Sequence, residues 1–212
     1  MAATLALVAV GLGSIVLANA LFDRGVPNYL TRKLAHVAGG LGFLISPFLF
    51  DTPLFPLLLS AVFTLTLGIC HTWAPQRIRG VGGSGRAGSM AEVWYPFACG
   101  VAIAIGWGLL QNPWLGVLPT LFLGFGDAVT GAVRTLVYKR ETKGIAGSIA
   151  MFAVCCVLAL LAHPYWIGLA GALTATCFER ITIASRRWDD NPALTISSTL
   201  VMSALYLGFV GP

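Results

Sequence analysis

Residues 54–73 read LFPLLLSAVFTLTLGICHTW, an apolar run that contains no Asp, Glu, Lys or Arg. A helix needs roughly 17–25 such residues to cross about 30 Å of hydrocarbon, and this run has that length. Apolar runs of the same kind lie on both sides of it, separated by short polar connections. We predict membrane-spanning helices at residues 4–22, 34–50, 54–73, 93–110, 114–137, 145–162, 165–178 and 193–210.

The overall composition agrees with a chain that lies in a bilayer. Of the 212 residues, 57% are hydrophobic and 10% are charged, and the mean hydropathy is +0.84. Soluble domains carry about 25% charged residues, so this chain could not cover a globular surface in water. We therefore predict an all-α polytopic membrane protein with about eight transmembrane helices, in one domain over residues 1–212. Seven and nine helices are the alternatives, because the sixth and seventh runs are short or broken.

The basic residues predict the orientation of the chain. We count Arg134, at the end of the fifth predicted helix, with the fifth connection. All 13 Lys and Arg residues then belong to the first, third, fifth and seventh connections, and the connections around Asp51, Asn112 and His163 contain none. Cytoplasmic loops are enriched in Lys and Arg, so we expect these basic connections in the cytoplasm and both termini outside. The formal net charge of +5 then reflects topology, and no nucleic-acid partner is expected.

Asp127, within GFGDAVTG at residues 124–131, is the strongest candidate for a functional residue. A carboxylate at membrane depth is costly unless it is paired, hydrated or bound to a metal. On a helix, Asp127, Thr130 and Arg134 share one face and form a polar stripe. We interpret Asp127 as a metal or proton site. An Asp127–Arg134 pair that only fixes helix packing is the alternative.

A second candidate segment is YKRETKGIAGS at residues 138–148. Glycines at the start of a helix leave backbone N–H groups and the positive end of the helix dipole available to phosphate. Nearby basic side chains would add charge-assisted hydrogen bonds. A role in topology alone is the alternative. The candidate phosphate-binding residues here are Lys139, Arg140, Lys143, Gly147 and Ser148.

A third segment, LTRKLAHVAGG at residues 30–40, opens the second predicted helix. Arg32 and His36 lie four residues apart and share a face with Gly40, whereas Lys33 is expected to point elsewhere. His36 is either a packing residue at the membrane interface or part of a site.

Carboxylates also gather near the basic connections, and the seventh connection is rich in them. Glu179, Asp189, Asp190 and Asn191 offer the oxygen ligands that Mg²⁺ prefers. A solvated loop followed by an ordinary helix start is the alternative reading of this stretch.

Taken in order, these segments resemble the membrane-embedded isoprenoid-alcohol kinases, the group of dolichol and phytol kinases. That group is distantly related to the phosphatidate cytidylyltransferases. The resemblance covers most of the chain from Arg32 onward. It rests on four short blocks, namely Arg32-Lys33 with His36, Gly126-Asp127-Ala128, Lys143 with Gly147-Ser148, and Asp190-Asn191.

The resemblance implies that the γ-phosphoryl group of a nucleoside triphosphate, typically CTP, is transferred to a long-chain prenyl alcohol at the cytoplasmic interface. It implies catalytic roles for Asp127, His36 and Lys143, with Mg²⁺ bound by Asp127 and Asp190. The nucleotide phosphates would contact Lys143, Gly147, Ser148 and Asn191, with Lys139 and Arg140 nearby. The alcohol would lie near Arg32, Lys33 and His36.

The chain departs from the family pattern at three positions. Gly144 and Ala146 stand where the family has serine and glutamate, and Arg134 stands where it has a glycine. Two other functions therefore stay open. One is a cytidylyltransferase that makes a CDP-lipid from a lipid phosphate, and the other is a small transporter with Asp127 as its cation or proton site. The sequence leaves a homodimer open as well.

Overall fold

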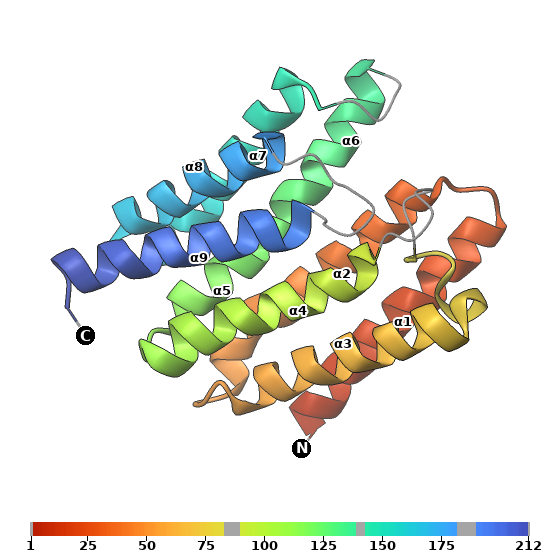
Figure 1. The fold of residues 1–212 in the computed structure, drawn as a ribbon, viewed down its shortest axis with the longest axis horizontal. Helices are drawn as coiled ribbons and strands as arrows, with labels where there is room; N and C mark the ends of the chain where they lie inside the picture. The colour runs from red at the N-terminus through yellow and green to blue at the C-terminus, as the bar shows by residue number, and fades with distance from the viewer. Residues whose placement is uncertain (1, 83–89, 139–142, 182–189, 212) are drawn as a thin grey trace.

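The computed structural model describes residues 2–82, 90–138, 143–181 and 190–211, and these ranges are helical and contain no strand. They form eight continuous helical rods, of which six are single α-helices. The first three rods are joined by short turns at the start of the chain (Figure 1). The elements are α1 (Ala2–Asp23), α2 (Asn28–Leu49), α3 (Leu54–Trp73), the 3₁₀ turn η1 (Pro75–Ile78), α4 (Ala91–Ile103), η2 (Ala104–Leu109), α5 (Pro113–Leu121), η3 (Phe122–Gly126), α6 (Asp127–Tyr138), α7 (Ile145–Ala159), α8 (Tyr165–Ile181) and α9 (Asp190–Phe209).

The prolines of the short connections lie at or next to helix starts, where a backbone N–H group is not needed for an intrahelical hydrogen bond. Pro53 is the N-cap of α3, Pro113 is the first residue of α5, and Pro164 directly precedes α8. Proline suits these positions because the missing N–H has no intrahelical acceptor there. In α5 the Asn112 side chain also caps the helix, accepting hydrogen bonds from the N–H groups of the second and third residues after it.

Two predicted helix starts were wrong, because apolar runs mark only the part of a helix that lies in hydrocarbon. Helix α2 begins at Asn28 rather than at residue 34, directly after Pro27, so Arg32 and Lys33 lie inside it. Helix α9 begins at Asp190 rather than at residue 193. In both cases polar residues extend the helix beyond its apolar part, and the candidate residues stand on rigid helices rather than on loops.

Two rods contain a π-helical segment that the sequence analysis did not predict. The segment η2 continues α4, and η3 connects α5 to α6 immediately before Asp127. Segments of this kind are rare and often occur at functional sites. A Cβ atom on Gly124 in η3 would lie 3.0 Å from both the Gly40 Cα and the His36 carbonyl oxygen of α2. This close backbone crossing brings the first residue of α6 against α2.

Helix α5 and η3 form the centre of the molecule. Every residue of α5 from Leu115 to Leu121 is buried, and this segment packs against α2, α4, α7, α8 and α9. The main core gathers around Leu118, Phe122 and Ile103, all without exposed surface. The polar residues of α6 therefore follow directly from the best-packed part of the chain, which fixes their position.

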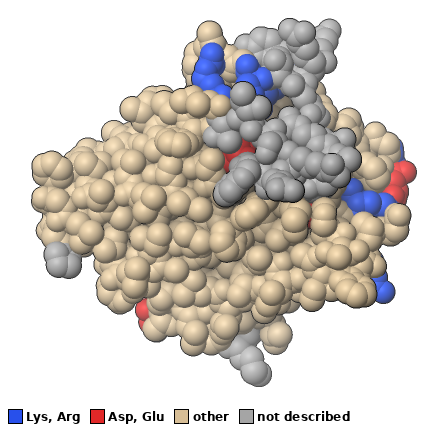
Figure 2. Space-filling view, viewed as in Figure 1, with Lys and Arg blue, Asp and Glu red and all other residues tan. Residues whose placement is uncertain are grey.

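Large apolar side chains are exposed over the outer surface, and most of the face drawn in Figure 2 carries no Lys, Arg, Asp or Glu. Trp73, Ile149 and Leu65 are 83%, 64% and 65% exposed, which suits a bilayer and not water. Within the described ranges, five rods are long and apolar enough to cross a membrane: Thr4–Asp23, Leu54–Trp73, Ala91–Leu109, Pro113–Val137 and Asp190–Phe209. Helix α7 is apolar but shorter, with 15 residues.

The two ends of the bundle differ in charge. Both termini and the turns around residues 51, 112 and 163 lie at one end in Figure 1, and the α1–α2 turn, η1 and the last turn of α6 lie at the other. The basic connections that the structure describes share this second end, and Lys and Arg side chains are visible there in Figure 2. The basic and non-basic connections that alternate along the sequence therefore lie at opposite ends of the folded bundle.

A matched pair of glycines in η2 tests the packing of this segment. A Cβ atom on Gly106 would lie 2.1 Å from the Gly116 nitrogen of α5, whereas one on Gly108 would have no neighbour closer than 3.8 Å. We expect Gly106→Ala to lower the unfolding free energy by at least about 1–3 kcal/mol and Gly108→Ala to be tolerated. Denaturant titration of the purified variants in detergent measures both, and equal stability of the two would contradict the close helix crossing.

Candidate functional site

Asp127 is buried at the start of α6 and forms an ion pair with Lys33 of α2. His36, one turn further along α2, places its Nδ1 atom 3.6 Å from the same carboxylate oxygen of Asp127. The Lys33 side chain runs over Gly131, where a Cβ atom would lie 3.3 Å from the Lys33 Cε. We call Lys33, His36 and Asp127 the Asp127 cluster.

The sequence analysis was wrong about the direction of Lys33. It placed Arg32 and His36 on one face and Lys33 elsewhere, but Lys33 and His36 both reach Asp127. Residues three apart on a helix are neighbours as well as residues four apart, so α2 presents two overlapping faces. Lys33 and His36 lie on one of these faces, and Arg32 and His36 lie on the other.

Tyr95 of α4 holds His36 from the other side. The two rings are stacked, with centroids 4.2 Å apart and an angle of 26° between their planes. The Tyr95 hydroxyl donates a hydrogen bond of 2.8 Å to the His36 backbone carbonyl. His36 Nδ1 has no hydrogen-bond partner within the described part of the chain. The imidazole is thus fixed in position, with this nitrogen facing the Asp127 carboxylate 3.6 Å away.

The polar stripe of α6 predicted from the sequence exists, and it faces the interior. Thr130, one turn after Asp127, has no exposed surface, and its hydroxyl donates to the Gly126 carbonyl at 2.9 Å. The same hydroxyl lies 3.4 Å from the Gly147 carbonyl of α7. Gly147 therefore packs directly on the stripe. A Cβ atom there would lie 3.0 Å from a Thr130 methyl group.

At the other end of the stripe, Arg134 forms an ion pair with Glu179 of α8, which has no exposed surface. Lys143, just before α7, donates to the backbone carbonyl of Glu179 and lies 3.6 Å from its carboxylate. Lys143 also donates to Asp190 of α9 at 3.1 Å. These four residues, the Glu179 cluster, join four elements in one network of two cations and two carboxylates.

The alternative reading of Asp127, a pair with Arg134, does not describe the structure. The two residues lie on one face, but each binds a partner on another helix. Asp190, predicted as a second metal ligand beside Asp127, lies with Lys143 in the Glu179 cluster. The stripe connects the two clusters through Thr130, which lies between Asp127 and Arg134 on α6.

Three further candidates occupy packed positions. Asn191 is buried in the first turn of α9, and its side-chain amide donates to the Ala91 carbonyl of α4 at 3.1 Å. Gly147 and Ser148 lie in the first turns of α7, and the Ser148 N–H donates to the carbonyl of Gly144, the N-cap residue. Lys139, Arg140 and Asp189 lie outside the described residues.

The carboxylates suit a cation, and each already binds one. A lysine ammonium lies against Asp127 and another against Asp190. Within the described residues, no group of three His, Cys, Asp or Glu side chains is placed to hold a metal ion. Mg²⁺ is commonly bound through one or two carboxylates together with substrate phosphates and water. These residues therefore fit a magnesium ion that is bound together with nucleotide phosphates, and not an ion held by the protein alone.

The sequence analysis did not identify the roles of three buried groups. Tyr95 fixes His36, and Glu179 neutralises Arg134, although it had been noted only as a possible oxygen ligand. Glu92 of α4 is buried and lies 2.6 Å from His71 Nδ1. Glu92 and Glu179 could have been identified because each is a carboxylate in or next to a predicted span, as Asp127 is.

Comparisons with models of protein families, with curated proteins and with solved structures find no match to this chain.

Proposed function

We propose that this protein is a kinase that uses a nucleoside triphosphate, with CTP the favoured donor, to phosphorylate a long-chain isoprenoid alcohol. The observation that supports the proposal most is the buried polar stripe of α6. It lies between two charged clusters, in a bundle with an apolar outer surface. An enzyme that transfers a group from a water-soluble nucleotide to a lipid needs charged residues inside the bundle, where the two substrates can meet.

The proposed orientation follows from the charge asymmetry. We propose a multi-pass membrane protein with about eight spans, both termini outside and the basic end of the bundle in the cytoplasm. The nucleotide would then reach the Glu179 cluster and the start of α7 from the cytoplasm. The alcohol would reach Arg32, Lys33 and His36 from the bilayer, so the two substrates meet along the polar stripe.

In the proposed reaction the alcohol oxygen attacks the γ-phosphorus, and the bond from this phosphorus to the β–γ bridging oxygen breaks. The nucleoside diphosphate leaves with the electron pair of that bond. His36 Nδ1 takes the hydroxyl proton, and the neighbouring Asp127 carboxylate, 3.6 Å away, stabilises the imidazolium that forms.

Cations around the phosphates provide the rest of the catalysis, because phosphoryl transfer depends mainly on positioning and on neutralising negative charge. Lys33 and Lys143, which pair with carboxylates in this structure, would exchange these for phosphate oxygens. Asp127 and Asp190 would then be the residues that hold Mg²⁺, and the ion would neutralise charge on the triphosphate.

A second function is favoured by one specific observation. Arg32 is 7% exposed, and no ion pair among the described residues includes it. A buried guanidinium suits a phosphate, and a lipid that already carries one would be the substrate of a cytidylyltransferase. There, the lipid phosphate oxygen attacks the α-phosphorus, and pyrophosphate leaves.

The released nucleotide product separates these functions. Purified protein in detergent is incubated with Mg²⁺, each of the four nucleoside triphosphates, and a panel of prenyl alcohols and lipid phosphates. We expect CDP and a prenyl phosphate from CTP and an alcohol. Pyrophosphate and a CDP-lipid would identify a cytidylyltransferase instead. No product in any lane, together with cation-coupled uptake into proteoliposomes without nucleotide, would overturn both and favour a transporter.

A further inference from the structure

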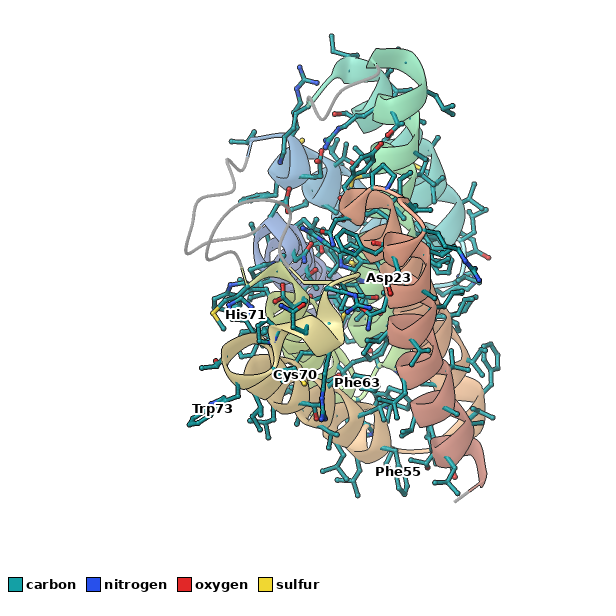
Figure 3. All side chains as sticks on the ribbon, turned by 90° about the vertical axis from the view of Figure 1, so that its right-hand side faces the viewer. Asp23, Phe55, Phe63, Cys70, His71 and Trp73 are labelled. Carbon is teal, nitrogen blue, oxygen red and sulfur yellow. The ribbon has the colours of Figure 1, made fainter. Side chains whose placement is uncertain are left out.

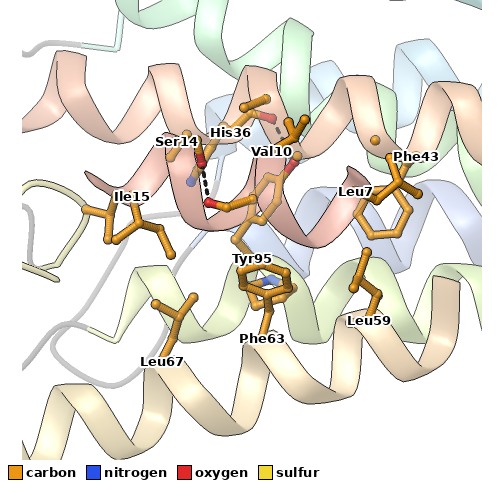
Figure 4. Close-up of a pocket in the computed structure, with 18 of the residues that line it drawn as sticks. Leu7, Val10, Ser14, Ile15, His36, Phe43, Leu59, Phe63, Leu67 and Tyr95 are labelled. Carbon is orange, nitrogen blue, oxygen red and sulfur yellow. Dashed lines mark hydrogen bonds between the residues drawn. The ribbon is translucent and has the colours of Figure 1, made fainter. Parts of the chain in front are cut away.

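An apolar cavity of about 110 Å³ lies between the α1–α2 and α3–α4 helix pairs. Figure 4 shows its walls, with Leu7 and Val10 of α1 on one side and Leu59 and Phe63 of α3 on the other. Phe43 and Tyr95 close the inner side toward the core. These walls offer contact for hydrocarbon and almost no hydrogen bonds.

The two helix pairs are joined at the basic end of the bundle. The Asn19 side chain of α1 donates to the Arg77 carbonyl and accepts from the Gly80 N–H. Asn28, the first residue of α2, donates to the Arg79 carbonyl at 2.7 Å. Away from this junction α1 packs mainly on α2, and α3 mainly on α4. The cavity occupies the space that this arrangement leaves.

The space between α1 and α3 adjoins the lipid-facing surface. Val10, which lines the cavity, is 48% exposed. In Figure 3, Phe63 points from α3 toward α1, whereas Trp73 points away from the bundle. A Cβ atom on Gly11 of α1 would lie 2.3 Å from the tip of the Phe63 ring. One side chain therefore spans most of the distance between the two helices.

The cavity ends in polar groups on the basic side. Arg32, His36 and Glu92 line this end. Glu92 is bonded to His71, whereas Arg32 Nε is buried and has no hydrogen-bond partner within the described ranges. A buried guanidinium without an anion is costly, and a bound anion would remove that cost. His36 belongs to this end and also to the Asp127 cluster, so the two sites are continuous.

We propose that this cavity binds the first part of the hydrocarbon chain of a lipid monophosphate, and that Arg32 binds its phosphate group. The inference rests on the proposed function, in which this lipid is the product of the kinase. For a cytidylyltransferase the same lipid would be the substrate. In both cases Arg32 is the residue that recognises the phosphorylated head group, and the α1–α4 cavity selects for a single narrow chain.

Binding of the lipid is tested without nucleotide, so that it does not depend on turnover. The probe is a long-chain alkyl phosphate with a photoreactive diazirine in its chain, and the matched alkyl alcohol is the second probe. Labelled residues are located by mass spectrometry. We expect the phosphate probe to label α1 and α3 at the residues that line the cavity. Even labelling of all lipid-facing helices would overturn the cavity as the chain site.

Two glycine variants test the cavity itself. Gly42 of α2 lines the cavity, and a Cβ atom there would have only Leu7 within 4 Å, at 3.7 Å. Gly42→Leu should therefore fill the cavity without disturbing the helix, and Gly13→Leu on the exposed face of α1, where a Cβ atom has no neighbour within 4 Å, is its control. We expect labelling to fall about tenfold in the first variant and to be unchanged in the second. Equal labelling would overturn the proposal.

An arginine variant tests the head group. Arg32→Gln should weaken binding of the alkyl phosphate about 10- to 100-fold and weaken binding of the alkyl alcohol, which has no phosphate, much less. Arg32→Lys should recover part of the loss, and Arg24→Gln on the exposed α1–α2 turn should have no effect.

Equal weakening of both probes would overturn the role of Arg32. Competition by inorganic phosphate as strong as that by alkyl phosphate would show a site for free phosphate and overturn the lipid. If the alkyl phosphate binds as expected but the protein transfers no phosphoryl group, the lipid site is supported and the proposed kinase activity is rejected.

Discussion

Replacement of Asp127 by asparagine is expected to lower phosphoryl transfer by at least about 10²–10³-fold. The amide keeps the size of the side chain but loses the charge that binds Lys33 in this structure. In the proposed reaction it could neither hold a magnesium ion at the phosphates nor stabilise protonated His36. Release of CDP from CTP and a prenyl alcohol, compared with the wild-type protein at saturating Mg²⁺, measures the loss.

The loss must be separated from a defect in folding. Removing one member of a buried ion pair typically costs about 3–5 kcal/mol, although the Lys33 side chain is 18% exposed, which moderates the cost. The double variant Asp127→Asn/Lys33→Met leaves no unpaired charge, so it should recover stability and remain inactive. Asp51→Asn, on the exposed turn after α2, is the control. Wild-type turnover by Asp127→Asn would rule out the proposed role.

Much of the fold could be predicted because a bilayer imposes a simple length rule on each helix. The predicted run at residues 54–73 coincides with α3, and the run at 114–137 with α5, η3 and most of α6. Asn28 and Asp190 were missed as helix starts because polar residues beyond the hydrocarbon follow capping and packing rather than hydropathy. The π-helical segment before Asp127 was missed because it depends on the close crossing of Gly124 with α2.

The candidate site was predictable along each helix but not between helices. Asp127, Thr130 and Arg134 share a face because they belong to one helix, and the structure confirms that face. Their partners lie far away in the chain, Lys33 by 94 residues and Glu179 by 45. Which of several charges meets Asp127 depends on how α2 is rotated against α6, and hydropathy does not determine this rotation.

The basic residues at the charged end of the bundle do more than indicate its orientation, because several of them form ion pairs within the fold. Lys33, Arg134 and Lys143 each bind a carboxylate from another element, so much of the buried positive charge is neutralised within the fold. Arg32 differs from them because no ion pair of the described residues includes it. Among the residues that the structure describes, Arg32 is the one Lys or Arg that is buried, and it lies at the end of the apolar cavity.

Glu179→Gln should be the most destabilising of the conservative substitutions considered for this protein. Glu179 has no exposed surface, and its carboxylate is the partner of Arg134 and lies 3.6 Å from Lys143. Its loss removes the carboxylate that pairs with Arg134 and one of the carboxylates near Lys143. Removing one side of such a buried network typically costs about 3–5 kcal/mol. Unfolding in detergent, followed by the helical circular dichroism signal against denaturant, measures the change.

The compensating variant gives this expectation its sharpest test. Glu179→Gln combined with Arg134→Met removes both members of the pair and should recover most of the lost stability, because no unpaired charge is left. Asp23→Asn breaks the exposed Asp23–Arg79 pair and should cost less than about 1 kcal/mol. If Glu179→Gln were as stable as the wild-type protein, the Glu179 cluster would not be a buried network. If the double variant recovers stability but not turnover, the stripe from Asp127 to Arg134 serves the reaction as well as the fold.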